Sequence, residues 1–173
     1  MLKIAQNLIN KYKLDVKLVN STGDFLGEYE RETDTIKLNI NKIQKIYKFK
    51  RKKELSYVKS LNEYIEVITC HELGHREDKE KRQKPSECIK ELIGKDIKNI
   101  SEEIYHNEIK EKAINRLLEE ELAAWELGRK YVRQDLMRAY DILNQDYLYR
   151  KRNKFEVDLD AQMSFIIESV GRY

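Results

Sequence analysis

The sequence predicts an α+β fold, with a small three-stranded antiparallel sheet near the N-terminus followed by a mainly helical domain. Two patterns lead to this prediction. Between residues 14 and 40, three short segments alternate apolar with polar side chains, and polar turns separate them. From about Leu55, apolar side chains instead recur every three or four residues, which is the period of a helix with one buried face.

The N-terminal elements are expected in the order helix, strand, strand, strand. Residues 2–11 place their apolar side chains on one helical face. The strands cover residues 14–19, 25–30 and 35–40, and the turns between them contain STGD and RETD. Residues 35–40 alternate most clearly, and we hypothesise that they form a sheet edge that pairs with an extended substrate.

The rest of the chain is expected to be helical. A helix of about 20 residues begins near Leu55 and carries CHELGH in its C-terminal half. Further helices are expected after Ser86, from residue 99 or 101 to beyond Tyr131, over residues 134–150, and after a capping aspartate at 158 or 160.

Charge and cysteine content narrow the class of protein. Lysine and arginine number 34 against 31 acidic residues, which leaves a net charge of +3, so nucleic acid is not the expected partner. Cys70 and Cys88 are too few for a disulfide framework, which favours a reducing compartment. The N-terminus has no signal-peptide pattern and no apolar run reaches about 18 residues, so we expect no membrane contact and a cytoplasmic location.

One basic stretch, KIYKFKRKKE at residues 45–54, has two interpretations. It could bind phosphate groups or an acidic partner, and a nucleic-acid accessory protein that uses residues 42–53 is one hypothesis for the chain. It could also be a solvated loop and helix start in a lysine-rich protein. We favour the second interpretation, because the whole chain is dense in charge.

The sequence HELGH at residues 71–75 has the spacing of a zinc site with an adjacent base. His71 and His75 would lie one helical turn apart on one face, where their imidazoles can bind one zinc ion. Glu72 would point about 100° further around the helix, beside the metal, and could accept a proton from a zinc-bound water. Because zinc lowers the pKa of that water toward about 7, the motif predicts peptide hydrolysis at neutral pH.

A catalytic zinc ion usually takes a third protein ligand and leaves its fourth position to water. The sequence LEEELAAWELG at residues 118–128 offers several glutamates beside small residues. Glu121 shares the apolar face of this helix, so we expect it to point inward, where a carboxylate must pair or bind metal. Glu120 is the second choice, and His106 is a weaker candidate among charged residues. The small residues would let this helix approach the CHELGH helix closely.

Three segments together resemble the gluzincin branch of the zinc metallopeptidases, and within it the ImmA/IrrE-type metallopeptidases of phages and mobile elements. GEYERETDTIKLNI resembles the strand pair that precedes the active-site helix in that family, CHELGH matches its metal motif, and EEELAAW resembles its third-ligand helix. The resemblance implies a zincin-like fold in which His71, His75 and Glu121 hold zinc and Glu72 is the general base.

The resemblance also implies the organisation of the chain, which we expect to be a single metallopeptidase-like domain over residues 1–173. Residues 1–79 would hold the first helix, the sheet and the active-site helix. Residues 80–110 would be an insertion, because the two metal-binding segments lie far apart in the sequence. Residues 111–173 would hold the third-ligand helix and the C-terminal helices.

The sequence therefore predicts a zinc metalloendopeptidase that hydrolyses peptide bonds in a protein or peptide substrate. Tyr105, His106 and Tyr131 are candidates for stabilising the oxyanion. A catalytically silent zinc-containing binding or regulatory protein of a phage or mobile element is the alternative, because it would use the same ligands. The presence of Glu72 favours the enzyme, since a structural zinc needs no base.

Overall fold

The computed structural model describes residues 1–50, 55–80 and 110–170. Contacts between residues divide the chain into two compact units. Unit 1 comprises Met1–Lys79 and Ala123–Asn144, and unit 2 comprises Glu80–Leu122 and Gln145–Tyr173. The single domain expected over residues 1–173 stays a prediction. The expected insertion and the helix after Ser86 fall almost wholly outside the described residues.

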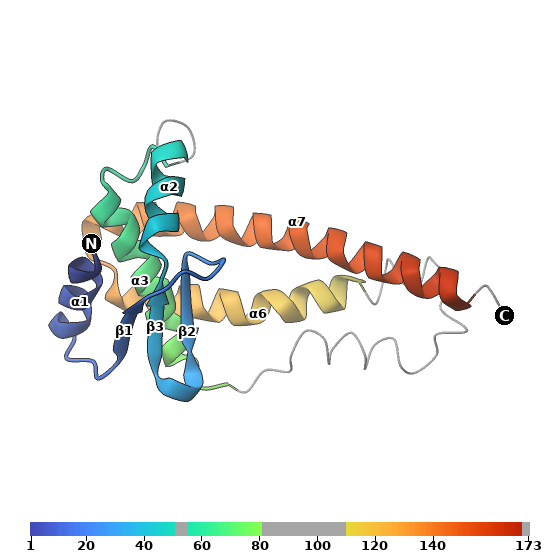
Figure 1. Cartoon of the computed structure of the whole chain (residues 1–173), viewed down its shortest axis with the longest axis horizontal. Coiled ribbons are helices and arrows are strands. Elements are labelled where there is room, and N and C mark those ends of the chain that lie inside the picture. Colours follow the sequence, from blue (N-terminus) through green and yellow to red (C-terminus); the bar gives the residue numbers. More distant parts are fainter. Residues whose placement is uncertain (51–54, 81–109, 171–173) are drawn as a thin grey trace. The chain divides into compact units, whose positions relative to one another are not determined.

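Unit 1 contains a three-stranded mixed sheet (Figure 1). Its strands are β1 (Lys17–Asn20), β2 (Gly27–Glu30) and β3 (Thr35–Leu38), in the spatial order β1-β3-β2. β1 runs parallel to β3, whereas β2 runs antiparallel to it. The expected α+β class and the small three-stranded sheet are confirmed, and the prediction that this sheet is antiparallel is wrong.

β2 and β3 form a hairpin around RETD, as expected. The turn contains the 3-10 helix η1 (Arg31–Thr33) and then Asp34, which has a positive φ of 45°. The hydroxyl of Tyr29 donates a hydrogen bond of 2.9 Å to the carboxylate of Asp34. The residue that closes the turn is therefore also tied to β2.

The path of the loop between β1 and β2 determines the order of the strands in the sheet. It does not close a hairpin, because it carries the chain past β3 to the other edge of the sheet. The side-chain amide of Asn39 donates to the carbonyl of Gly23 at 2.7 Å and so holds this loop beyond the end of β3. The central strand is β3, and its side chains Ile36 and Leu38 are fully buried. The hypothesis that residues 35–40 form a sheet edge is therefore wrong, and β2 is an edge instead.

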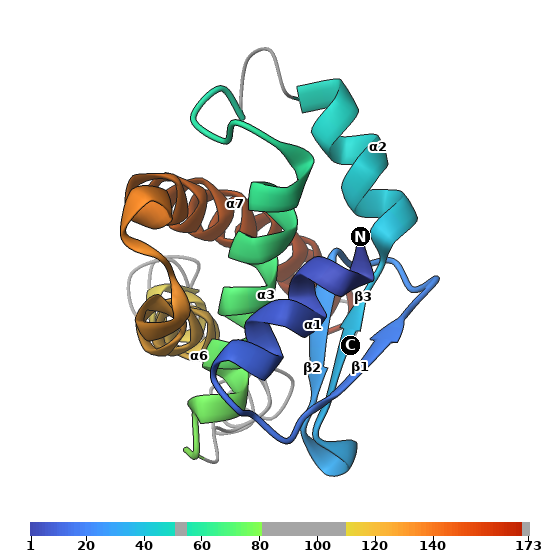
Figure 2. The same ribbon diagram turned by 90° about the vertical axis from the view of Figure 1, so that its left-hand side faces the viewer.

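Helix α3 (Leu61–Glu77) is the central element of unit 1 and contacts α1 (Leu2–Lys11), β2 and β3 (Figure 2). The hydroxyl of Ser60 accepts a hydrogen bond from the backbone N–H of Glu63, whose carboxylate accepts one from the N–H of Lys59. This reciprocal cap starts the helix several residues after Leu55. The predicted CHELGH helix and the predicted N-terminal helix are both confirmed.

Helix α2 (Ile40–Lys50) follows β3 directly. It contains much of the basic stretch that the sequence assigns to a loop and helix start. Ile40, Ile43 and Tyr47 form its buried side, at the spacing of one helical face. Residues 51–54, the rest of the basic stretch, lie outside the described residues.

Two later helices continue from one unit into the other. α6 (Glu111–Gly128) ends earlier than predicted, because the short 3-10 helices η4 (Arg129–Tyr131) and η5 (Gln134–Leu136) follow it. α7 (Met137–Val170) is one helix of 34 residues, where the sequence suggested two. The aspartates expected to cap a final helix instead lie inside α7.

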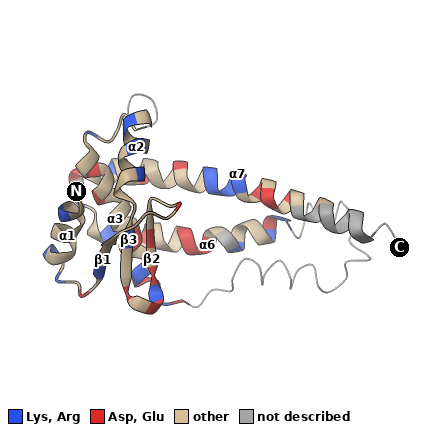
Figure 3. Cartoon of the chain, in the orientation of Figure 1, with Lys and Arg blue, Asp and Glu red and all other residues tan. Residues whose placement is uncertain are grey.

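In unit 2, the first turns of α6 pack on the second half of α7. Ala113 and Ile114 share a small buried cluster with Leu159. Lys110, just before α6, forms ion pairs with two residues of α7, Glu156 at 3.0 Å and Asp160 at 2.9 Å. Charges of both signs lie along these helices (Figure 3). Among the described residues, no helix is both long and apolar enough to cross a membrane.

Candidate metal centre

His71 and His75 lie one turn apart on α3. Their ring centroids are 4.7 Å apart, and His71 is only 6% exposed. A helix places residues i and i+4 on one face, so this geometry follows from the spacing in HELGH once the segment is helical. Two imidazoles on one face in this way can bind the same metal ion.

Two glycines let α3 and the last turns of α6 meet backbone to backbone. A Cβ atom at Gly74 would lie 1.7 Å from the carbonyl oxygen of Ala124. A Cβ atom at Gly128 would lie 2.3 Å from the carbonyl oxygen of Cys70. The close approach expected from the small residues of α6 is therefore present, and it fixes the end of α6 against the histidine helix.

Glu121 brings a carboxylate to the two histidines. It precedes Ala124 by one turn of the same unbroken helix, so the contact made by Ala124 also sets the position of Glu121. Ligand atoms of His71, His75 and Glu121 all lie within 4.8 Å of one another, so these residues could hold a metal ion.

The neighbouring glutamates of α6 point elsewhere. Glu119 and Glu120 are exposed, whereas Glu121 is 7% exposed. The pattern that placed Glu121 on the apolar side of this helix thus distinguishes the three carboxylates correctly. Glu120, the second choice for a ligand, is not part of the group.

Trp125 supports the first histidine. Its ring stacks on the ring of His71, with centroids 4.3 Å apart and an angle of 25° between the planes. The hydroxyl of Tyr140 donates a hydrogen bond of 2.7 Å to the Trp125 carbonyl, and the two rings contact edge to face. The sequence analysis gave Trp125 no role at the site. Its position four residues after Glu121, on the same helical face, was the available signal.

Glu72 is 4% exposed and lies against the edge strand β2. A Cβ atom at Gly27 would lie 2.4 Å from its Oε1 atom, so only glycine leaves the carboxylate where it is. The sequence analysis did not identify Gly27. A glycine inside a strand often marks a close approach of another group, which was the signal it carried.

Arg76, directly after His75, ties the end of α3 to the β2–β3 turn. Its guanidinium donates to both carboxylate oxygens of Asp34, at 2.9 and 3.0 Å. The Arg76 side chain holds the pKa of Asp34 below its ordinary value, although partial burial acts against this shift. This two-point contact fixes the orientation of the helix turn that carries His75.

Tyr131, a candidate for stabilising an oxyanion, belongs to a neighbouring cluster. Its hydroxyl donates a 2.6 Å hydrogen bond to Glu77, and Lys130 pairs with the same carboxylate at 2.7 Å. Burial, followed by the contact with Glu77, raises the pKa of Tyr131. Its catalytic role stays a prediction. Tyr105 and His106 lie outside the described residues.

Lys151 of α7 forms an ion pair with Oε1 of Glu121, and both residues belong to unit 2. The Lys151 side chain is 36% exposed, and that of Glu121 is 10% exposed. A metal ion on Glu121 would compete with this ammonium, because both are cations. The sequence carried no signal for Lys151.

The donor set fits zinc. Two imidazole nitrogens and one carboxylate oxygen occur together in catalytic zinc sites, at about 2.0–2.2 Å from the ion. Tetrahedral ligands at that distance are about 3.4 Å apart, so only small side-chain rotations separate this group from such a geometry. Cys70 is fully buried and outside the group, and burial raises the pKa of its thiol.

Comparison of the chain with models of protein families, with curated proteins and with solved structures gives no match. The functional argument therefore depends on the residues of the site.

Proposed function

We propose that this chain is a zinc-dependent metallopeptidase that hydrolyses peptide bonds in a protein substrate. One observation carries the proposal: the carboxylate of Glu121 lies beside His71 and His75, which flank Glu72 on α3. The same residues support an assignment to the gluzincin type, similar to the ImmA/IrrE-type metallopeptidases.

Each residue of the site has a separate role in this proposal. His71, His75 and Glu121 would hold zinc and leave one position open. When bound, zinc supplies a Lewis acid that polarises the scissile carbonyl and makes water more acidic. Glu72 accepts the proton of the attacking water and passes it to the departing amine.

The surrounding contacts keep these groups in place. Gly27 leaves space for the carboxylate of Glu72, and Trp125 holds the ring plane of His71. A positioned base of this kind typically contributes a rate factor of about 10²–10⁴. Because Glu72 is buried against β2, its side chain is restricted to few rotamers. A carboxylate held in this way is better suited to act as a general base than the mobile carboxylate of a surface glutamate.

Metal content tests the site. Elemental analysis of purified wild type should give about one zinc per chain. Glu121→Ala should lose most of this zinc, whereas Glu120→Ala, the matched change on the adjacent exposed residue, should keep it. Zinc that survives both changes would move the third ligand elsewhere. Iron in place of zinc would overturn the hydrolytic proposal, because the same donor set also serves iron(II) oxygenases.

Activity is tested with a peptide library made from a digested proteome, in which cleavage creates new N-termini that mass spectrometry detects. Wild type loaded with zinc should cut a defined subset of peptides. Glu72→Gln should bind zinc equally well but cut at least about 10²-fold more slowly. Zinc binding without cleavage by either protein would favour the silent regulatory protein instead.

A further inference from the structure

A second feature of unit 1 lies on the outer side of α2. Lys42, Lys45, Ile46, Phe49 and Lys50 follow the spacing i, i+3, i+4, i+7, i+8, which places them on one helical face. This face is opposite the buried side of α2. Phe49 is 84% exposed, more than any other large apolar side chain among the described residues. Exposure of a phenylalanine ring to this extent leaves most of its apolar surface in water.

These residues line a groove of about 890 Å³. The β1–β2 loop and the start of α2 complete its lining, with Thr22, Asp24, Asn39 and Asn41. A volume of this size is in the range of ligand-binding clefts. None of the described residues that line the groove belongs to the candidate metal centre, so the groove is a separate site.

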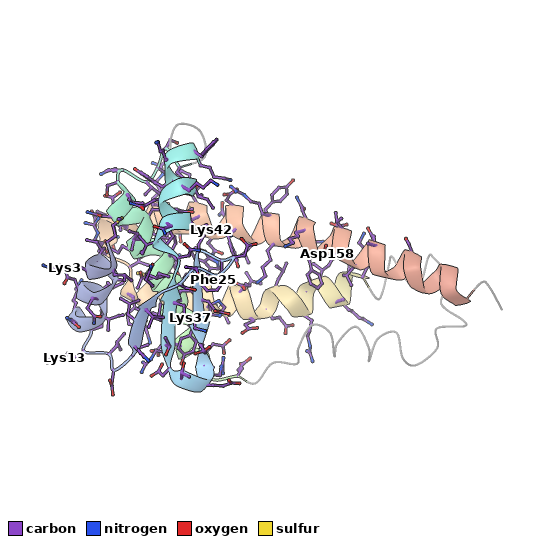
Figure 4. The ribbon with its side chains drawn as sticks, in the orientation of Figure 1. Lys3, Lys13, Phe25, Lys37, Lys42 and Asp158 are labelled. Carbon is purple, nitrogen blue, oxygen red and sulfur yellow. The ribbon has the colours of Figure 1, made fainter. Side chains whose placement is uncertain are left out.

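The groove is held open by hydrogen bonds rather than by the chance position of a loop. Asn39 donates from its side-chain amide to the carbonyl of Gly23, and its side-chain oxygen accepts from the N–H of Lys42 at 2.9 Å. The same side chain therefore anchors the loop and caps α2. Lys42 also pairs with Asp24 at 2.5 Å, and Figure 4 labels this lysine on α2 and Phe25 on the loop.

The charge of the groove selects for an acidic ligand. α2 contains four lysines and no acidic residue. Among the described residues that line the groove, Asp24 is the one carboxylate, and it forms an ion pair with Lys42. Lys45, which also lines the groove, is exposed. The lining thus combines excess positive charge with an apolar surface.

We propose that this groove binds a short acidic segment of a partner protein, with an apolar side chain on Ile46 and Phe49 and carboxylates facing the lysines. From Lys42 to Lys50 the helix rises roughly 12 Å, the length of about four residues of extended peptide. The site is therefore suited to a linear motif rather than a folded surface.

Nucleic acid fits the lining less well. Each nucleotide brings a phosphate, so a bound strand needs a series of cations along its path. Here the exposed carboxylate of Asp24 lines the groove and neutralises Lys42. A peptide with one or two acidic residues and an apolar anchor matches the limited charge and the apolar lining of the groove.

The test is a selection of random 12-residue displayed peptides on the full-length chain, with counter-selection on the double variant Lys45→Glu, Phe49→Ala. The recovered peptides should share an acidic residue next to an aromatic or aliphatic one. A synthetic copy of the best peptide should bind Phe49→Ala and Lys45→Glu at least about tenfold more weakly than wild type. Lys48→Glu is the matched control, since Lys48 is exposed on the same helix but does not line the groove; it should stay within about twofold.

Other outcomes overturn the proposal. Peptides that bind the double variant as tightly as wild type, or that bind Lys48→Glu as weakly as Lys45→Glu, would show attraction to the helix charge alone. The oligonucleotide (dT)12 is measured in parallel. If it binds wild type more tightly than the best peptide and the double variant abolishes its binding, the groove belongs to nucleic acid. Failure to recover any enriched peptide would also reject the peptide site. None of these results bears on zinc or on Glu72.

Discussion

Replacing Gly74 with alanine tests the contact that places the third ligand. A new Cβ would lie 1.7 Å from the carbonyl oxygen of Ala124, 2.6 Å from its carbonyl carbon and 2.8 Å from the backbone nitrogen of Gly128. All three are backbone atoms, so no side chain can rotate away. Carbon and oxygen atoms that are not bonded approach to about 3.3 Å, so the two helices must separate locally by about 1.6 Å.

The energetic cost follows from this separation. Overpacking a tight contact costs about 1–3 kcal/mol, and a clash with backbone belongs at the upper end. Alanine recovers about 1 kcal/mol of helix propensity relative to glycine. The net loss is therefore about 2 kcal/mol in the free energy of unfolding, or roughly 4–8 °C in Tm for a chain of this size.

Metal affinity should fall as well. Glu121 lies on the same helix one turn before Ala124, so a displaced α6 carries the carboxylate with it. Zinc sites tolerate deviations of only about 0.2 Å in ligand distance. Gly74→Ala should weaken zinc binding at least about tenfold, in the range seen when a supporting contact of a metal ligand is lost.

The assay has two readouts: thermal unfolding with a chelator present, and zinc affinity by competition with a chromophoric chelator. Gly23→Ala is the control, because the three atoms nearest to a Cβ there all belong to the half-buried side chain of Phe25, which can rotate. Unchanged Tm and zinc affinity in Gly74→Ala would refute the close contact between the helices. A lower Tm with unchanged zinc affinity would show that the position of Glu121 does not depend on this contact.

Three further changes probe the surroundings of the site. Gly27→Ala should keep its zinc but cleave substrate about 10²-fold more slowly, because the new methyl group displaces the carboxylate of Glu72 by about 1 Å. Lys151→Met should bind zinc about fivefold more tightly in the chelator competition, because the metal no longer displaces an ammonium from Glu121. Asp34→Asn keeps a residue that tolerates positive φ but removes the charge, so its unfolding in urea should be less sensitive to acid than that of wild type. The sign follows from the lowered pKa of Asp34: its stabilisation is complete above the ordinary aspartate pKa of about 3.9 and is lost as the pH falls through the lower value of the folded state.

Each of these changes has an outcome that contradicts its reasoning. Full activity in Gly27→Ala would show that Glu72 does not transfer the proton. Weaker zinc binding in Lys151→Met would mean that the lysine supports the site. If Asp34→Asn and wild type lose stability in parallel as the pH falls below about 4, the Arg76 contact does not contribute to acid stability.

The sequence was most informative where a residue pattern determines local geometry. Once residues 71–75 are helical, the spacing of His71 and His75 is enough to place both imidazoles on one side of a metal site. The inward position of Glu121 followed from the apolar face of its own helix, which the exposure of Glu119 and Glu120 bears out. Both are properties of one helix, so no knowledge of the tertiary fold was required.

Long-range arrangement was less predictable, for a physical reason. Alternation in residues 35–40 shows that one face of a strand is buried, but it does not identify the neighbouring strands. A hairpin between β1 and β2 was the simplest arrangement, and the Asn39 anchor that prevents it involves a residue far from that loop in sequence. Gly27 and Trp125 were missed for the same reason, since their importance depends on what approaches them.

The crossing at Gly74 and Gly128 also has a consequence for evolution. Because neither position has room even for a Cβ atom, a descendant chain that keeps the crossing must keep glycine at both, whatever happens to the rest of the sequence. The spacings H-E-x-G-H in one helix and E-x-x-A-x-x-x-G in the other record that constraint. Together they form a search pattern for diverged relatives that is more selective than the histidine motif alone.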